Sequence, residues 1–334
     1  MYCKVENFTT FNFVNPIDNS MSYQYVLYDL EQNVVRFQKE GVVTSVHGKS
    51  RFQFILFNPF TKATINSQNC QFSAPFLAIS FSSLPTSPDC IVFAITQDMD
   101  GQVRIYFIKK GEAFWSSCPF ANTDADKYIP PLNTPVFYNG DFYSVDYNGS
   151  LAVFKVDGNG INWKVLEKPH KPFDSIYPSF LVECDRELLL VKMGRLGTLF
   201  GIFRLDSSRM DWIKIENLGK FMLFVSHTSC FSVIAPPNSR MKNKVYFPRL
   251  CMNGEGVLFY CLETGSYRSF GSRHSASDFS DTQGWYFNCT WIQENNRANS
   301  TDQELDWVKC PSSRASSTST SQGLVNGPPY KKFT

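Results

Sequence analysis

The chain has 334 residues, of which 43% are hydrophobic, 16% are aromatic and 19% are charged, and its formal net charge is +2. It is long enough to bury a large core, and its aromatic excess favours strands over helical bundles. The small net charge leaves no basic surplus to neutralise a phosphate backbone, which excludes nucleic acid as an expected partner. No stretch approaches the roughly 20 apolar residues that cross a bilayer, and we expect no membrane association.

The N-terminal residues and the cysteines indicate the cellular compartment. The first twenty residues lack an uninterrupted apolar stretch followed by a small-residue cleavage site, so we expect no secretory signal. The ten cysteines show no compact spacing, and we interpret them as reduced, mostly buried thiols. Four Asn-X-Ser/Thr sequons are interpreted as chance occurrences. We therefore predict that the protein is cytoplasmic and/or nuclear and is not secreted. We also expect a monomer.

The first third of the chain carries two weak copies of a hairpin pattern, Tyr25–Phe37 and Phe54–Ile65, after a lead segment over residues 1–21. Between these copies, Gly41–Ser50 superficially resembles a phosphate loop. Six residues separate Gly41 from Gly48, whereas the motif needs four, and no helical pattern follows. We interpret Gly48 as part of a turn between two strands.

Two dipeptides in the next part of the chain predict β-hairpins. Asp100-Gly101 separates the apolar runs IVFAIT and VRIYFI, and Asn148-Gly149 separates DFYSV from LAVFKV. Asp98 and Asp100 also have the spacing of calcium ligands. The twelfth position of that loop is Lys109 instead of Glu, so a turn explains the pattern better than a metal site.

A longer pattern repeats with a period of about 50 residues. The stretches Val153–Glu167 and Ile202–Glu216 share an apolar-Phe-basic-apolar-Asp pattern followed by a Trp, and a third copy contains Trp115. The shared tryptophans, Trp115, Trp163 and Trp212, are interpreted as packing residues between sheets, with ligand stacking as the alternative. Residues 180–216 contain four strand-like runs in a row, which is the size of one propeller blade.

A sixth, weaker copy at Leu258–Phe270 completes the series, and a period near 50 residues is typical of kelch repeats. The prediction is an all-β, kelch-like β-propeller over residues 22–293, with about six four-stranded blades and a range of five to seven. We expect N- and C-terminal strands to close the ring, so that a strand within Tyr23–Phe37 shares a sheet with the strand around Trp285–Trp291. Residues 294–334 include a Ser/Thr-rich run that cannot form a core, so we predict a disordered tail.

The best candidate for partner binding is a basic connection in Pro236–Lys244, where Arg240, Lys242 and Lys244 crowd together. Loops on a rigid ring are common binding positions. The alternative is an ordinary solvated basic loop.

Sequence motifs for catalysis, metals and cofactors are absent. The four histidines stand far apart, and no Cys-X-X-Cys, His-Glu-X-X-His or Gly-X-Ser-X-Gly occurs. We expect no catalytic residue, no metal and no cofactor. The alternative is a propeller enzyme with a catalytic cluster in the central channel, for which His227 and Cys230 are the first pair to inspect.

The chain also resembles the plant F-box-associated KIB-type β-propeller family. The resemblance is carried by Leu218–Phe247, Asn58–Ile65 and the terminal Cys289–Ile292, in the family's order. It implies a propeller that presents substrates to a cullin ubiquitin ligase, in which an N-terminal F-box docks a Skp-type adaptor. No leucine-rich helical segment precedes Tyr25. We therefore expect a non-enzymatic protein-interaction scaffold that does not bind the adaptor by itself.

Overall fold

The computed structural model consists of strands joined by turns, and none of the residues it describes forms a helix. Accordingly, no described helix is long and apolar enough to cross a membrane. Backbone is described for residues 2–6, 10–14, 22–26, 34–38, 42–46, 52–57, 64–72, 76–97, 103–120, 133–146, 149–157, 160–169, 179–193, 199–250, 257–269, 272–273 and 289–291. Side chains are described for residues 77–97, 103–120, 133–146, 149–157, 160–169, 179–193, 199–247, 258–268 and 291.

The described strands form six sheets. Sheet 1 contains β26 (Cys289–Trp291), β1 (Tyr2–Glu6), β2 (Thr10–Val14) and β3 (Ser22–Val26), and sheet 2 contains β4 (Val34–Gln38), β5 (Val42–Val46), β6 (Phe52–Phe57) and β7 (Thr64–Phe72). Sheet 3 contains β8 (Phe76–Phe81), β9 (Ile91–Gln97), β10 (Val103–Lys109) and β11 (Ser116–Pro119). Sheet 4 contains β12 (Val136–Tyr138), β13 (Asp141–Val145), β14 (Leu151–Asp157) and β15 (Gly160–Val165).

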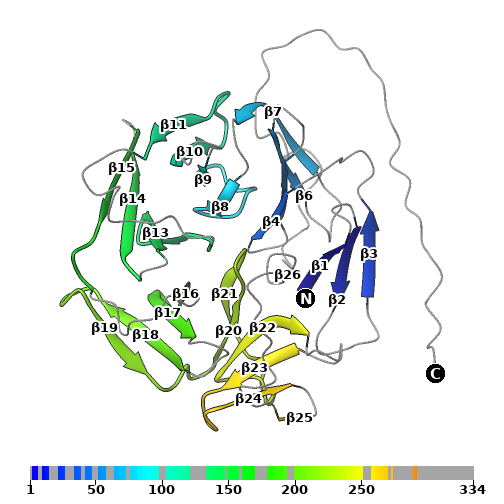
Figure 1. Ribbon diagram of the computed structural model, residues 1–334, viewed down its shortest axis with the longest axis vertical. Coiled ribbons are helices and arrows are strands. Elements are labelled where there is room, and N and C mark those ends of the chain that lie inside the picture. Colours follow the sequence, from blue (N-terminus) through cyan, green and yellow to red (C-terminus); the bar gives the residue numbers. More distant parts are fainter. Residues whose placement is uncertain are drawn as a thin grey trace.

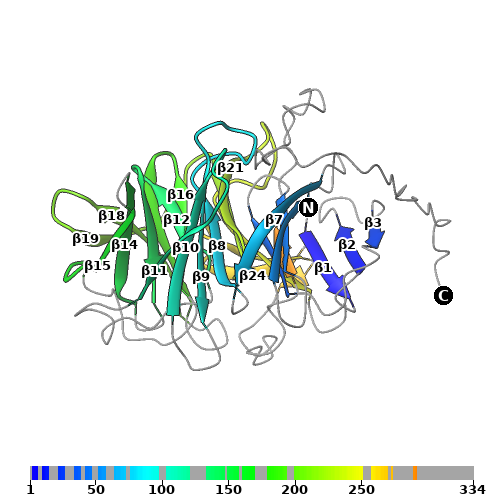
Figure 2. The same ribbon diagram turned by 90° about the horizontal axis from the view of Figure 1, so that it is seen from above.

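Sheet 5 contains β16 (Ser179–Cys184), β17 (Glu187–Met193), β18 (Phe200–Asp206) and β19 (Asp211–Ile215). Sheet 6 contains β20 (Phe221–Val225), β21 (Cys230–Ile234), β22 (Lys244–Leu250), β23 (Val257–Cys261), β24 (Ser266–Ser269) and β25 (Ser272–Arg273). The sheets stand around a common centre (Figure 1). Seen from the side, the strands of sheets 3 to 5 run along the axis of the ring (Figure 2).

This arrangement confirms an all-β propeller. Side-chain packing between neighbouring sheets is described for sheets 3 to 6, so four blades can be followed from backbone to core. Both predicted hairpins are confirmed, because β9 pairs with β10 and β13 pairs with β14. The predicted four-stranded meander over residues 180–216 is sheet 5. The count of about six kelch-like blades stays a prediction.

Sheet 5 explains why the strand sequences are apolar on both faces. In β17, Val191 packs toward sheet 6, whereas Leu188 and Leu190 pack toward sheet 4. Alternate side chains of a strand point to opposite faces, so a strand covered on both sides reads as a continuous apolar run. Sheets 3 and 4 are packed in the same way, and Phe93 of sheet 3 stacks on Phe142 of sheet 4 with ring centroids 4.7 Å apart.

The N-terminal boundary differs from the prediction. The expected lead segment over residues 1–21 contains β1 and β2, which lie between β26 and β3 in sheet 1. The pattern over Tyr25–Phe37 is not a hairpin, because β3 pairs with β2 while β4 pairs with β5 in another sheet. A strand within Tyr23–Phe37 does share a sheet with the terminal strand, since β3 and β26 both belong to sheet 1.

Sheet 6 also departs from the four-stranded expectation, because it has six strands and a parallel pair, β20 and β22. The cause is the connection over residues 235–243, which returns along the start of β20. The Asn243 amide N–H donates to the Phe221 carbonyl at 2.8 Å, and the Asn243 side chain accepts from the Leu218 N–H at 2.9 Å. These bonds bring β22 beside β20.

Residues 294–334, the predicted disordered tail, lie outside the described residues, as do Asp98, Asp100 and Gly48.

Candidate functional site

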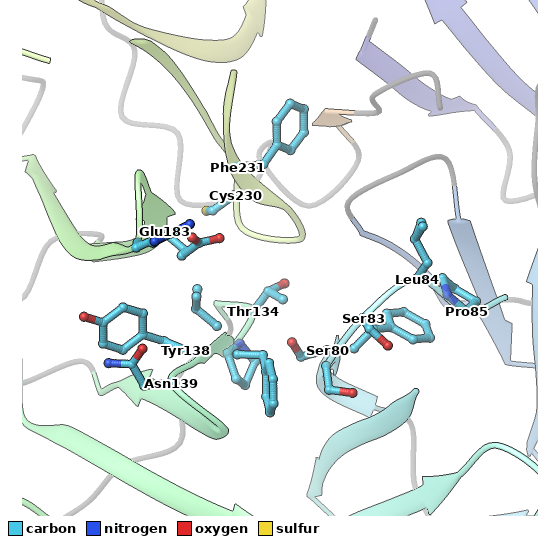
Figure 3. A pocket seen from close by; sticks show the side chains of 16 residues that line it. Ser80, Ser83, Leu84, Pro85, Thr134, Tyr138, Asn139, Glu183, Cys230 and Phe231 are labelled. Carbon is cyan, nitrogen blue, oxygen red and sulfur yellow. The ribbon is translucent and has the colours of Figure 1, made fainter. Parts of the chain in front are cut away.

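A pocket of about 340 Å³ lies where the inner strands of sheets 3, 4, 5 and 6 meet near the centre of the ring (Figure 3). Its position follows from the fold, because one edge strand of each of these sheets, β8, β12, β16 or β21, faces the axis. The β8–β9 loop forms one wall, and the β12, β16 and β21 regions form the others. The lining residues are Ser80–Pro85, Thr134–Asn139, Glu183, Arg186, Cys230 and Phe231.

The wall of the pocket is chemically mixed. Phe81, Leu84, Phe137 and Phe231 contribute apolar surface, and serine and threonine hydroxyls contribute hydrogen-bonding groups. The charged side chains of the lining are one carboxylate, Glu183, and one guanidinium, Arg186. Pockets with apolar walls and a few polar groups are the usual binding sites of proteins.

Two tight turns stand at the rim of this pocket. The β12–β13 turn is Asn139-Gly140, with φ angles of 49° and 92°. The β16–β17 turn is Asp185-Arg186, with φ angles of 53° and 63°. Two-residue hairpin loops with positive φ at both positions favour Asn-Gly or Asp-Gly. Arg186 therefore occupies a position where glycine is the ordinary residue.

A hydrogen-bonded group joins three sheets beside the pocket. The His227 Nδ1 atom lies 2.7 Å from the Asn133 Oδ1 atom, and the Asn133 amide group donates to the Ser179 carbonyl. The Thr134 N–H donates to the His227 carbonyl at 3.2 Å. This group fixes the start of β12 against sheets 5 and 6.

His227 and Cys230, the pair singled out as a possible catalytic cluster, therefore have separate hydrogen-bond partners. The Cys230 thiol donates to the Ser226 carbonyl at 3.2 Å, and burial raises the pKa of this thiol to about 12. A thiol must ionise to act as a nucleophile. Cys230 is thus held in its unreactive form at neutral pH.

Possible metal ligands do not gather in the part of the chain that the structure describes, where no group of three His, Cys, Asp or Glu side chains could hold an ion. Among the residues whose side chains are described, the cysteines are free thiols, namely Cys90, Cys118, Cys184, Cys230 and Cys261.

The three residues of the predicted basic cluster differ in their exposure to solvent. Arg240 and Lys242 are exposed, whereas Lys244 begins β22 and is half-buried. The Lys244 ammonium lies 4.8 Å from the centroid of the Phe259 ring and donates to the Arg240 carbonyl. Lys244 therefore holds the loop in place, and none of the three lines the pocket.

The three repeated tryptophans occupy different environments. Trp212 is 8% exposed in β19, opposite Leu205, while Trp163 is half-buried in β15, opposite Phe154. Trp163 stacks on Phe120, which directly follows β11 of sheet 3, and the two ring centroids are 4.0 Å apart. Trp115 is half-buried and directly precedes β11. Trp163 and Trp212 do not occupy equivalent places, because turns of different length shift the two rings along the ladder.

Sequence reasoning missed Glu183, Arg186 and the β8–β9 loop. A signal for Arg186 was present, because a two-residue connection without glycine stands between the runs FLVEC and ELLLVKM. The central position of the β8–β9 loop depends on the ring and is not visible in local sequence.

Comparisons with known proteins agree on one family. The family model described as KIB1-4 beta-propeller matches residues 18–270. An F-box/kelch-repeat protein from Arabidopsis thaliana is 30% identical over 78% of this chain and 74% of its own length. An F-box protein from the same plant is 27% identical over 58% of this chain and 52% of its own length.

Among solved structures, a mutant of Trypanosoma rangeli sialidase displaying trans-sialidase activity aligns with a TM-score of 0.36 and 10% identity. The alignment covers 77% of this chain and 48% of that chain, and a likeness at this level carries no argument.

Proposed function

Because the chain belongs to the KIB1-4 β-propeller family, we propose that it is a protein-interaction scaffold that binds a protein partner at the pocket end of the ring. The observation that carries this proposal is the pocket itself, which is bounded by four sheets and rimmed by tight turns. Rigid strands hold these turns in fixed positions, and such loops are where binding residues concentrate. The role proposed here is non-enzymatic.

The ring that carries this site is proposed to have six kelch-like blades and to close between sheets 1 and 6. Support comes from β26, which pairs with β1 and contacts β22 and β4. Trp291 of β26 is fully buried, and its ring lies 4.9 Å from the Phe224 ring in an edge-on arrangement. The Ser229 hydroxyl donates to the Trp291 carbonyl at 2.9 Å and accepts from the Trp291 N–H at 3.1 Å.

A role in ubiquitin ligases is the finer part of the proposal. Its support is that the similar plant proteins are named F-box proteins. We propose that the propeller presents a substrate, acts in the cytoplasm and/or the nucleus, and leaves adaptor binding to an F-box. Recovery of a Skp-type adaptor with residues 1–334 alone would contradict that division.

The binding end can be tested with one matched pair of variants. Leu84 lines the pocket, whereas Leu199 is 59% exposed directly before β18, at the end of sheet 5 opposite the Asp185-Arg186 turn. Leu84→Trp fills the pocket, and we expect it to lose most of the protein that the tagged chain recovers from plant extract. Leu199→Trp is expected to recover the same protein as the wild-type chain. Equal recovery by both variants would place the interaction elsewhere.

A further inference from the structure

We propose that Arg186 and the adjoining pocket bind an acidic-apolar segment of the partner, with an Asp or Glu carboxylate on the guanidinium and an apolar side chain inside the pocket. This inference rests on the proposed function, and it adds the chemistry of the segment. It starts from the backbone of the β16–β17 turn.

Arg186 adopts a left-handed backbone conformation, with a φ angle of 63°. Residues with a Cβ atom rarely adopt this conformation, and a hairpin turn of this type ordinarily has glycine there. Sheet 4, the neighbouring blade, has the usual glycine in the corresponding turn, where Gly140 has a φ angle of 92°. The turn of sheet 5 thus has an arginine where the backbone favours glycine. Backbone geometry therefore does not account for this residue, and a role of its side chain would.

The Arg186 side chain is exposed, lines the pocket and makes no hydrogen bond or ion pair with any residue the structure describes. Its neighbour Glu187 is engaged elsewhere, since its carboxylate lies 2.7 Å from the Arg204 guanidinium. The fold therefore does not use Arg186 in an internal ion pair with Glu187. A guanidinium at a pocket rim is suited to bind a carboxylate through two parallel hydrogen bonds.

The rest of the pocket selects among anions. A single arginine faces a wall that also contains the Glu183 carboxylate. Phosphorylated segments are generally bound by clusters of arginines, and the lining of this pocket contains one arginine. The geometry favours a singly charged Asp or Glu over a phosphorylated residue. Phe81, Leu84 and Phe231 supply apolar surface, and about 340 Å³ accommodates one or two side chains.

The test uses the full chain and a displayed library of random twelve-residue peptides as the probe. Four variants are compared with the wild type: Arg186→Gly, Arg186→Glu, Arg209→Glu and Met210→Gly. Arg209 is an exposed arginine in the β18–β19 turn and controls for charge. Met210 has a φ angle of 50° in that same turn and controls for release of backbone strain. Neither control residue lines the pocket.

We expect the wild-type chain to select peptides with Asp or Glu within a few residues of an apolar side chain. Arg186→Gly should weaken their binding at least about tenfold, as loss of a charge-assisted pair does. It should also raise the melting temperature by about 1 °C, because glycine fits the turn. Arg186→Glu should reject these peptides and accept versions in which the acidic residue is changed to Lys. Both control variants should bind like the wild type.

Several results would overturn the proposal. These are selection of no peptide, selected peptides without acidic residues, a preference for phosphorylated versions, or equal affinity for Arg186→Gly and the wild type. A partner protein that still binds Arg186→Gly at full strength but is lost with Leu84→Trp would leave the proposed function standing and refute the acidic segment. If neither variant affects the protein recovered, the proposed function fails as well.

Discussion

Sheets 4 and 5 are neighbours built on the same strand order, yet they differ at both ends of their sequence repeat. Their outer hairpins share the tryptophan pattern, but two residues connect Asp157 to Gly160, whereas four connect Asp206 to Asp211. Their inner turns are Asn139-Gly140 and Asp185-Arg186. The repeated pattern determines that blades form. The departures from it decide which ring is buried and which turn offers a charged side chain to a partner.

The largest expected difference between the two sheets is in their tryptophans. Trp212→Ala should lower the free energy of unfolding by about 3–5 kcal/mol, because the Trp212 ring is buried. Trp163→Ala should cost about half as much, since its ring is half-buried and rests on Phe120. Urea unfolding of both variants measures the two losses. Equal losses would show that the register shift does not set the packing.

Alkaline pH should weaken sheet 5 through a buried thiol, whereas the group with a raised pKa in sheet 4 is the Tyr143 phenol, which ionises at a higher ordinary pKa of 10. Burial raises the pKa of the Cys184 thiol to about 11, from an ordinary value near 9, while residues 136–165 of sheet 4 contain no cysteine. The folded state then holds a proton that the unfolded state releases, so this stabilisation is complete below pH 9 and is lost as pH rises toward 11. Cys184→Ala should flatten the decline in the free energy of unfolding over that range. An unchanged decline would assign it to other thiols, such as Cys90, whose pKa is also raised by burial to about 11.

The inner turns should respond to substitution with opposite signs. Gly140 has a φ angle of 92°, and nothing lies within 4 Å of a Cβ atom added there, so Gly140→Ala adds backbone strain without a clash. We expect a loss of about 1 kcal/mol in the free energy of unfolding. Arg186→Gly changes the sequence in the opposite direction and should not lower stability. A destabilised Arg186→Gly variant would mean that the arginine supports the fold.

The smallest effect concerns the basic residue that follows Phe in each repeat. Arg204 pairs with Glu187 at 2.7 Å, but the two side chains are 40% and 45% exposed. Exposed pairs contribute little to stability, so Arg204→Ala should lower the melting temperature only slightly. Lys155→Ala at the matching position of sheet 4 should be close to neutral. Thermal unfolding at low and high salt checks both, because salt should erase the difference.

Strand runs, hairpin signals and the period near 50 residues predicted the propeller, because apolar pattern and turn chemistry are local properties. The ends of the chain were predicted less well. The strand β1 pairs with β26 from the other end of the chain, and the local sequence of β1 does not reveal that pairing. The pocket was missed for a related reason, since Leu84, Thr134, Glu183 and Phe231 meet only after four sheets are arranged around one centre.

The most direct test of the binding end is site-specific photo-crosslinking in plant cells. A photoreactive phenylalanine would replace Asp185 or Asn139, two exposed residues at the pocket rim, and in a parallel chain Leu199, which is exposed at the opposite end. We predict that the two rim positions crosslink to the same protein and that position 199 does not. Crosslinks to that protein from position 199 alone would contradict a partner bound at the pocket.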